Sequence, residues 1–152
     1  EDIFYSGTVG AAIAGRRLNY VPVAFSVSAF APKNLEFIAK KAAIITEQAK
    51  QLPSDQNLLI NVNFPDLPSS QIAGIKITKL GKRAIPDTPD LIRKNKLSSF
   101  YIFGPSGCLI PDQVNTDIQA VEGNFISISI LDYNLTANEA DWHIFETAFI
   151  NA

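Results

Sequence analysis

The residues near the start of the chain that could do chemistry are the triplet Ser6-Gly7-Thr8. A run of small residues and two cations, Arg16 and Arg17, follow it, and this order is typical of a short helix. A helix start offers unpaired N–H groups and a positive dipole end, and hydroxyls beside a glycine add donors for a phosphate. Ordinary helix N-caps show the same pattern more often, so spacing alone leaves both interpretations open.

Metal-binding chemistry has few candidate side chains. Glu1 and Asp2 are adjacent carboxylates that could serve a hard cation, although such pairs usually lie in solvent or favour a following helix start. The chain has one cysteine, Cys108, and one histidine, His143, which exclude an internal disulfide and a His/Cys metal cluster. Any metal would need carboxylate or amide oxygens.

Two patterns superficially suggest a hydrolase nucleophile, and we reject both. The segment 104–108 resembles a nucleophile elbow, but Cys108 replaces its last glycine and a proline precedes its serine. A Ser-His-Asp triad would have to use His143, which follows Trp142 in an expected helix and is better explained as a packing or surface residue.

Two further patterns stay open. Lys79, Lys82 and Arg83 form a small basic cluster, either a solvated strand end or a group that faces an anion. The triplet 134–136 matches a glycosylation acceptor, which has no meaning without a sign of secretion.

Hydrophobic periodicity predicts the elements that would position these residues. A helix is expected from Ser6 to Arg17 and an amphipathic one from Leu35 to Leu52. The remaining expected elements are strands at 21–28, 58–64, 75–80, 99–103 and 125–131, and a final helix at 138–149. The alternation of helix and strand indicates an α/β sheet built from crossover units.

Composition limits the class of protein. With 152 residues, 47% of them hydrophobic, the chain can form one domain with a sizeable core. Its 13 Lys and Arg against 15 Asp and Glu give a net charge of −2, which excludes a general nucleic-acid-binding charge. No apolar run spans a membrane. The chain begins with Glu1 and has no Met, so we expect a piece of a longer protein.

Several separated motifs resemble the survival protein SurE family of nucleotidases. The segment 2–12, D-I-F-Y-S-G-T-V-G-A-A, is similar to a long, specific family motif, and 59–65 resembles its L-N-V-N-x-P strand. Matches continue at 74–83, at Thr116-Asp117 with Ala120-Val121, and at 123–128, and they end near residue 136. Asn124, Ile130 and Asn134 depart from the family's tyrosine, proline and aspartate.

The resemblance implies a divalent-metal-dependent phosphomonoesterase acting on nucleoside 5′- or 3′-monophosphates, with possible exopolyphosphatase activity. Ser6 and Thr8 would be catalytic, Ser6, Gly7 and Thr8 would bind phosphate, and Asp2 and Asp117 would support the site. The metal, Mg or Mn, would be held by ligands upstream of this chain.

The resemblance also implies a Rossmann-like three-layer α/β core with a projecting hairpin. We expect the C-terminal portion of one SurE-like domain: core at 1–80, projecting arm at 81–122, and final strand with an oligomerisation segment at 123–152. Homodimers or homotetramers are expected, in the cytoplasm, without nucleic acid or membrane. The alternative is an inactive SurE-derived oligomerisation or binding fragment that lacks the metal site.

Overall fold

The computed structural model describes residues 2–53, 57–85, 88–102, 107, 110–111, 113–139 and 142–149, with Asp2, His143 and Ile144 described by their backbone only. Its centre is a four-stranded sheet in the order β1-β2-β6-β3. These strands are β1 (Val23–Val27), β2 (Leu58–Phe64), β3 (Gly74–Thr78) and β6 (Phe125–Asp132). β1 and β2 are parallel, whereas β6 runs antiparallel to β2 and parallel to β3.

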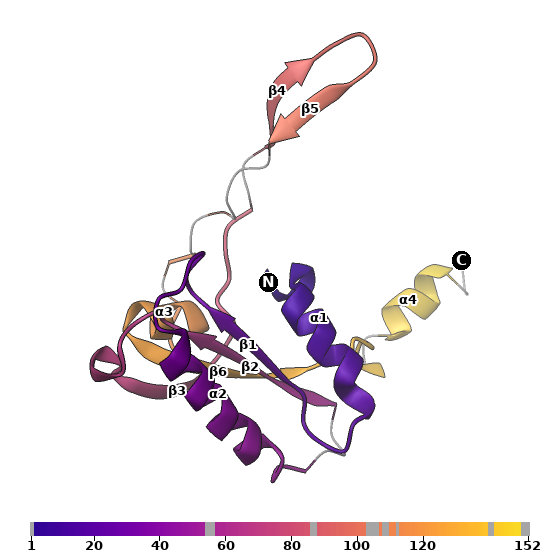
Figure 1. Ribbon diagram of the computed structural model, residues 1–152. Coiled ribbons are helices and arrows are strands. Elements are labelled where there is room, and N and C mark those ends of the chain that lie inside the picture. Colours follow the sequence, from indigo (N-terminus) through magenta and orange to yellow (C-terminus); the bar gives the residue numbers. More distant parts are fainter. Residues whose placement is uncertain are drawn as a thin grey trace.

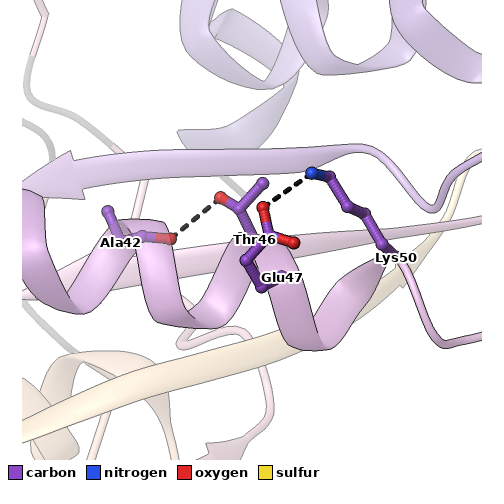
Figure 2. Close-up of polar contacts among 4 residues, drawn as sticks. All are labelled: Ala42, Thr46, Glu47 and Lys50. Atoms are coloured by element: carbon purple, nitrogen blue, oxygen red, sulfur yellow. Dashed lines mark hydrogen bonds and ion pairs between the residues drawn. The ribbon is translucent and has the colours of Figure 1, made fainter.

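Helix α2 (Leu35–Ala49) connects β1 to β2 and is the predicted crossover helix. Its buried residues Ile38, Ile45 and Ala49 recur at helical spacing and pack on one face of the sheet. Its outer surface carries charged side chains beside the exposed Leu35 and Ile44. Lys50 donates to Glu47 at 2.6 Å, which raises the pKa of Lys50 through that hydrogen bond and the opposite charge (Figure 2). Thr46 donates its hydroxyl back to the carbonyl of Ala42 at 2.8 Å. Helix formation therefore follows from a one-sided apolar pattern.

The start of α2 is fastened by a side chain that follows β2. The Asp66 carboxylate accepts from the backbone N–H of Lys33 at 2.8 Å and of Asn34 at 2.9 Å, and from the Asn34 amide at 3.0 Å. These bonds hold the pKa of Asp66 below its ordinary value. The end of β2 and the beginning of α2 are thus joined at one edge of the sheet.

Helix α1 (Gly7–Ala14) lies on the opposite side of the sheet from α2 (Figure 1). It is preceded by a 3-10 turn at Asp2–Tyr5 and followed by another, η2, at Gly15–Arg17. Its Val9 packs with Ala24, Leu59 and Leu131 in a second, smaller core cluster. The three layers, helix, sheet and helix, agree with the predicted α/β architecture.

The segment between β3 and β6 contains a projecting hairpin that the sequence predicted only in part. β4 (Asp90–Lys94) pairs antiparallel with β5 (Ser99–Ile102), and every residue of both strands is exposed. Their turn is organised by Asn95, whose carboxamide oxygen accepts from the N–H groups of Leu97 and Ser98. Figure 1 shows the hairpin standing well away from the sheet.

The last residues of that segment return to the sheet as α3 (Asp117–Glu122), a helix that periodicity does not predict. Thr116 and Gln119 form a capping box, in which the Thr116 hydroxyl accepts from Gln119 N–H at 3.3 Å and the Gln119 amide oxygen from Thr116 N–H. A helix of six residues is too short to show hydrophobic periodicity, so the capping box is the sequence feature that indicates it. A short 3-10 turn at Ser69–Gln71 precedes β3.

The final helix α4 (Trp142–Phe149) confirms the predicted amphipathic element. Trp142, Phe145 and Phe149 are exposed, and α4 lies to one side of the sheet (Figure 1). Among the described residues, no helix is long and apolar enough to cross a membrane.

Candidate functional site

A cleft of about 400 Å³ opens beside the carboxyl ends of β1 and β2. Its floor comes from the ends of these strands, one wall from Ser6 and Val9 at the beginning of α1, and the other wall from α3. Arg83 reaches it from the segment after β3. Ligands of open α/β sheets bind at this kind of position, where neighbouring helices diverge beyond the carboxyl ends of parallel strands.

Ser6 is the N-cap of α1 and lines the cleft. Its Oγ accepts from the N–H of Val9 at 3.1 Å, and its carbonyl accepts from Gly10 N–H at 2.9 Å. Because the oxygen is the acceptor in the cap, the hydroxyl hydrogen can still be donated to a ligand. The N-cap and phosphate-binding interpretations of this serine are therefore compatible.

Gly7 and Thr8 stand in the first turn of the same helix, but both are solvent exposed and neither lines the cleft. A Cβ added at Gly7 or at Gly10 would meet nothing within 4 Å. These two glycines are therefore not needed for a close approach of the helix to the sheet. Their exposed backbone leaves room for an incoming group at the helix start.

Asp117 lines the cleft and ties two of its segments together. Its Oδ1 accepts from Gly81 N–H at 2.7 Å and from Ile118 N–H at 2.9 Å. A Cβ at Gly81 would lie 2.8 Å from Cδ1 of Ile118 and 3.2 Å from Asp117 Oδ1, so a side chain there would have to displace the Ile118 side chain. Asp117 thereby holds the chain two residues before Arg83.

The basic cluster predicted from the sequence divides in the structure. Arg83 lines the cleft and donates to the carbonyl of Gly107 at 3.5 Å, whereas Lys79 and Lys82 are exposed outside the lining. Of the cleft-lining residues, Arg83 is the one cation, and Asp117 and Glu122 are the acids. Arg83 can therefore contribute a planar array of donors to an anion.

The floor of the cleft carries polar residues that the sequence analysis missed as site residues. Asn61 and Asn63 lie on one face of β2, beside Ser26 and Ser28 at the end of β1. The signal was present in the strand L-L-I-N-V-N-F, where polar residues occupy every second position of an otherwise apolar run. When a buried strand alternates in this way, its polar face is expected to border a polar cavity or a ligand site.

Some predicted positions cannot be placed. Glu1, residues 104–106 of the rejected elbow, and Cys108 lie outside the described residues, as do the side chains of Asp2 and His143. Within the described part of the chain, no three His, Cys, Asp or Glu residues come together in a way that could hold a metal ion.

The fold and the cleft define an α/β protein with a ligand site at the carboxyl ends of its parallel strands. The sequence pattern described as "Survival protein SurE" matches residues 1–87, and the chain belongs to this family. It is 35% identical over 144 residues to the 5′-nucleotidase SurE of Trichormus variabilis, covering 89% of this chain and 54% of that protein. It is 32% identical over 139 residues to the 5′/3′-nucleotidase SurE of Wigglesworthia glossinidia brevipalpis, covering 91% and 55%.

A solved structure agrees with this assignment. The crystal structure of the SurE protein from Aquifex aeolicus superposes with a TM-score of 0.75 at 30% identity, covering 95% of this chain and 60% of that one. The α/β core is therefore of the SurE type. The chain spans about half the length of the curated relatives it matches.

Proposed function

We propose that this chain is the C-terminal portion of a phosphomonoesterase that hydrolyses nucleoside 5′- or 3′-monophosphates to nucleoside and phosphate. The observation that carries the proposal is the meeting of Ser6, Arg83 and the start of α1 at one cleft. The names of the relatives, 5′-nucleotidase and 5′/3′-nucleotidase, support the choice of substrate class. Activity on short polyphosphate belongs to the same proposal, since it needs the same phosphate-binding groups.

In this proposal the chain's own groups bind and orient the phosphate. The Ser6 hydroxyl and the first N–H groups of α1 donate to phosphate oxygens, and the helix dipole favours the negative charge. Arg83 adds charge-assisted donors from the opposite side. Asp117 holds Arg83's segment in place through Gly81. Donors arranged before the reaction stabilise charge that develops on the phosphate oxygens.

A divalent cation, Mg or Mn, is part of the proposal, with ligands from residues that this chain does not contain. Such an ion, when bound by those residues, would supply Lewis-acid polarisation of the phosphate and activation of a water. Among the described residues, no group of three or more His, Cys, Asp or Glu side chains fits such an ion.

Assembly as a homodimer or homotetramer is also part of the proposal. The exposed hairpin carries Leu91, Ile92, Tyr101 and Ile102, and α4 exposes three aromatic side chains. Exposed apolar groups of this size, on elements that stand away from the core, support contact with other subunits.

Two glycines of α1 provide a matched test. Gly7→Ala and Gly10→Ala each add one methyl group to an exposed helix, and each methyl would meet nothing within 4 Å. Both variants should therefore keep or raise the melting temperature, because alanine favours helix by up to about 1 kcal/mol over glycine. If phosphate approaches the helix start, Gly7→Ala should lower kcat/KM about tenfold or more, and Gly10→Ala should leave it unchanged.

The assay is phosphate release from adenosine 5′- and 3′-monophosphate by the full-length protein, with and without a chelator. Ser6→Ala and Thr8→Ala should also reduce turnover. If both leave activity unchanged, their assigned roles are wrong. If the full-length protein releases no phosphate with Mg or Mn present, the proposed activity is wrong. Chelator-insensitive phosphate release by this chain alone would contradict the inactive-fragment alternative.

A further inference from the structure

Asn61 is buried among polar neighbours yet makes no side-chain hydrogen bond. It is 5% exposed and lines the cleft. No hydrogen bond joins its carboxamide, or that of Asn63, to any other residue that the structure describes. In the described part of the chain no buried side-chain nitrogen or oxygen lacks a hydrogen-bond partner, so the unpartnered carboxamide atoms of Asn61 are open to the cleft, where a ligand can reach them.

The neighbouring strand β6 carries polar side chains on the same face of the sheet, and their hydrogen bonding can be compared with that of Asn61 and Asn63. Ser127 and Ser129 on β6 are 0% and 1% exposed, and both hydroxyls lie within hydrogen-bond distance of Thr78 Oγ1, at 2.7 Å and 2.9 Å. Ser129 is the register partner of Asn61, and Ser127 is the partner of Asn63. The hydroxyls on β6 and β3 therefore satisfy one another, whereas the asparagines on β2 face the cleft.

The chemistry of a carboxamide narrows the choice of ligand group. Phosphate oxygens at neutral pH mainly accept hydrogen bonds, and Ser6 and Arg83 already supply donors in this cleft. A carboxamide both donates and accepts, which matches a hydroxyl group. Asn61 and Asn63 are two residues apart on one strand face, about 6.4–6.8 Å along the strand. Two carboxamides at this spacing can bracket a sugar that carries neighbouring hydroxyls.

We propose that Asn61 and Asn63 bind the ribose hydroxyls of the nucleoside monophosphate, so that the floor of the cleft holds the leaving nucleoside while α1 and Arg83 hold its phosphate. This inference rests on the proposed function and extends it to the sugar. It makes both asparagines binding residues that distinguish a nucleotide from other phosphomonoesters.

The experiment compares three substrates in the full-length protein. Adenosine 5′-monophosphate has both ribose hydroxyls, its 2′,3′-dideoxy analogue has neither, and p-nitrophenyl phosphate has no sugar. The unaltered protein should prefer the ribonucleotide over the dideoxy analogue by about 10- to 100-fold in kcat/KM, the cost of leaving buried polar groups unpaired. Asn61→Leu should lose a similar factor with the ribonucleotide, and remain within about twofold on p-nitrophenyl phosphate.

Asn19→Leu is the matched control, since Asn19 is exposed and lies outside the cleft lining. Equal loss on all three substrates would show that Asn61 serves the phosphate end or the fold, and would overturn the proposal. Equal rates on the ribonucleotide and the dideoxy analogue would overturn it without any variant, even if Asn61→Leu fails to fold. Absence of turnover on every substrate would instead contradict the proposed function itself.

Discussion

The two faces of the sheet are built from the same strands but have opposite character. On β2, Ile60, Val62 and Phe64 point toward α2 and join a closed apolar core. The alternate residues Leu59, Asn61 and Asn63 point the other way, where apolar packing under α1 gives way to a polar cleft. Because side chains alternate along a strand, one segment can stabilise the fold with one face and bind a ligand with the other.

The largest effect should come from the α2 face. Phe64 is 0% exposed at the end of β2, so Phe64→Ala should lower the free energy of unfolding by about 3–5 kcal/mol through lost burial and a residual cavity. Phe30→Ala, at a side chain that is fully exposed, should change stability by less than about 0.5 kcal/mol. Urea denaturation of the full-length protein measures both. Similar values for the two variants would contradict the assignment of this face as the main source of stability.

A smaller loss of stability should follow from removing the buried Thr78 hydroxyl, which is hydrogen-bonded to two serines of β6. Thr78→Val keeps the shape of the side chain but leaves Ser127 and Ser129 without their shared partner, at a cost of about 1–3 kcal/mol. Thr46→Val makes the same chemical change on α2, where the hydroxyl only bonds back to Ala42 (Figure 2), and should cost about 0.5 kcal/mol or less. If the two variants unfold at the same denaturant concentration, the buried network does not stabilise the polar face.

The smallest effect on stability should depend on pH. It concerns the hydrogen bonds by which Asp66, after β2, holds the start of α2. The pKa of Asp66 is lowered in the folded state by its hydrogen bonds to Lys33 and Asn34, so its stabilisation is present above the ordinary pKa of 3.8. This contribution is lost as the pH falls through the lowered pKa. Asp66→Asn should therefore melt at a lower temperature than the unaltered protein at pH 7.

The same variant should converge with the unaltered protein in acid. Asp90→Asn, on the exposed hairpin, removes an equal charge and is the control. Melting curves from pH 7 down to the lowest pH at which the protein remains folded provide the measurement. A difference that grows as the pH falls would have the wrong sign and would refute this account of Asp66.

Much of the architecture could be predicted because it depends on local pattern. The helical spacing of Ile38, Ile45 and Ala49 and the β-branched run of β2 both reappear as expected. α3 and β4 could not be predicted, since one is too short for periodicity and the other is fully exposed, without a buried face to mark it. Asn124, a departure from the family motif, adopts φ 66°, which asparagine tolerates better than most residues.

The candidate site could be predicted only where its residues are contiguous. Ser6 was found because a hydroxyl before a glycine at a helix start is a local signal, and the SurE resemblance added Asp117. Ser6 and Asp117 line the cleft, but the roles assigned to them, like those assigned to Gly7, Thr8 and Asp2, stay predictions. Asn61 and Asn63 were quoted in a matching strand but were not assigned a role, because only the fold shows which face of that strand opens onto the cleft.

The sequence by itself determined the family and the elements other than α3 and β4, since propensities, caps and motifs act over a few neighbouring residues. Tertiary structure alone decided that β6 enters between β2 and β3, and that Ser6, Asn61, Arg83 and Asp117 meet at one cleft. The order of the strands and the assembly of the cleft both depend on contacts between residues far apart in the chain. Their free energy comes from burying complementary faces, which no local pattern contains.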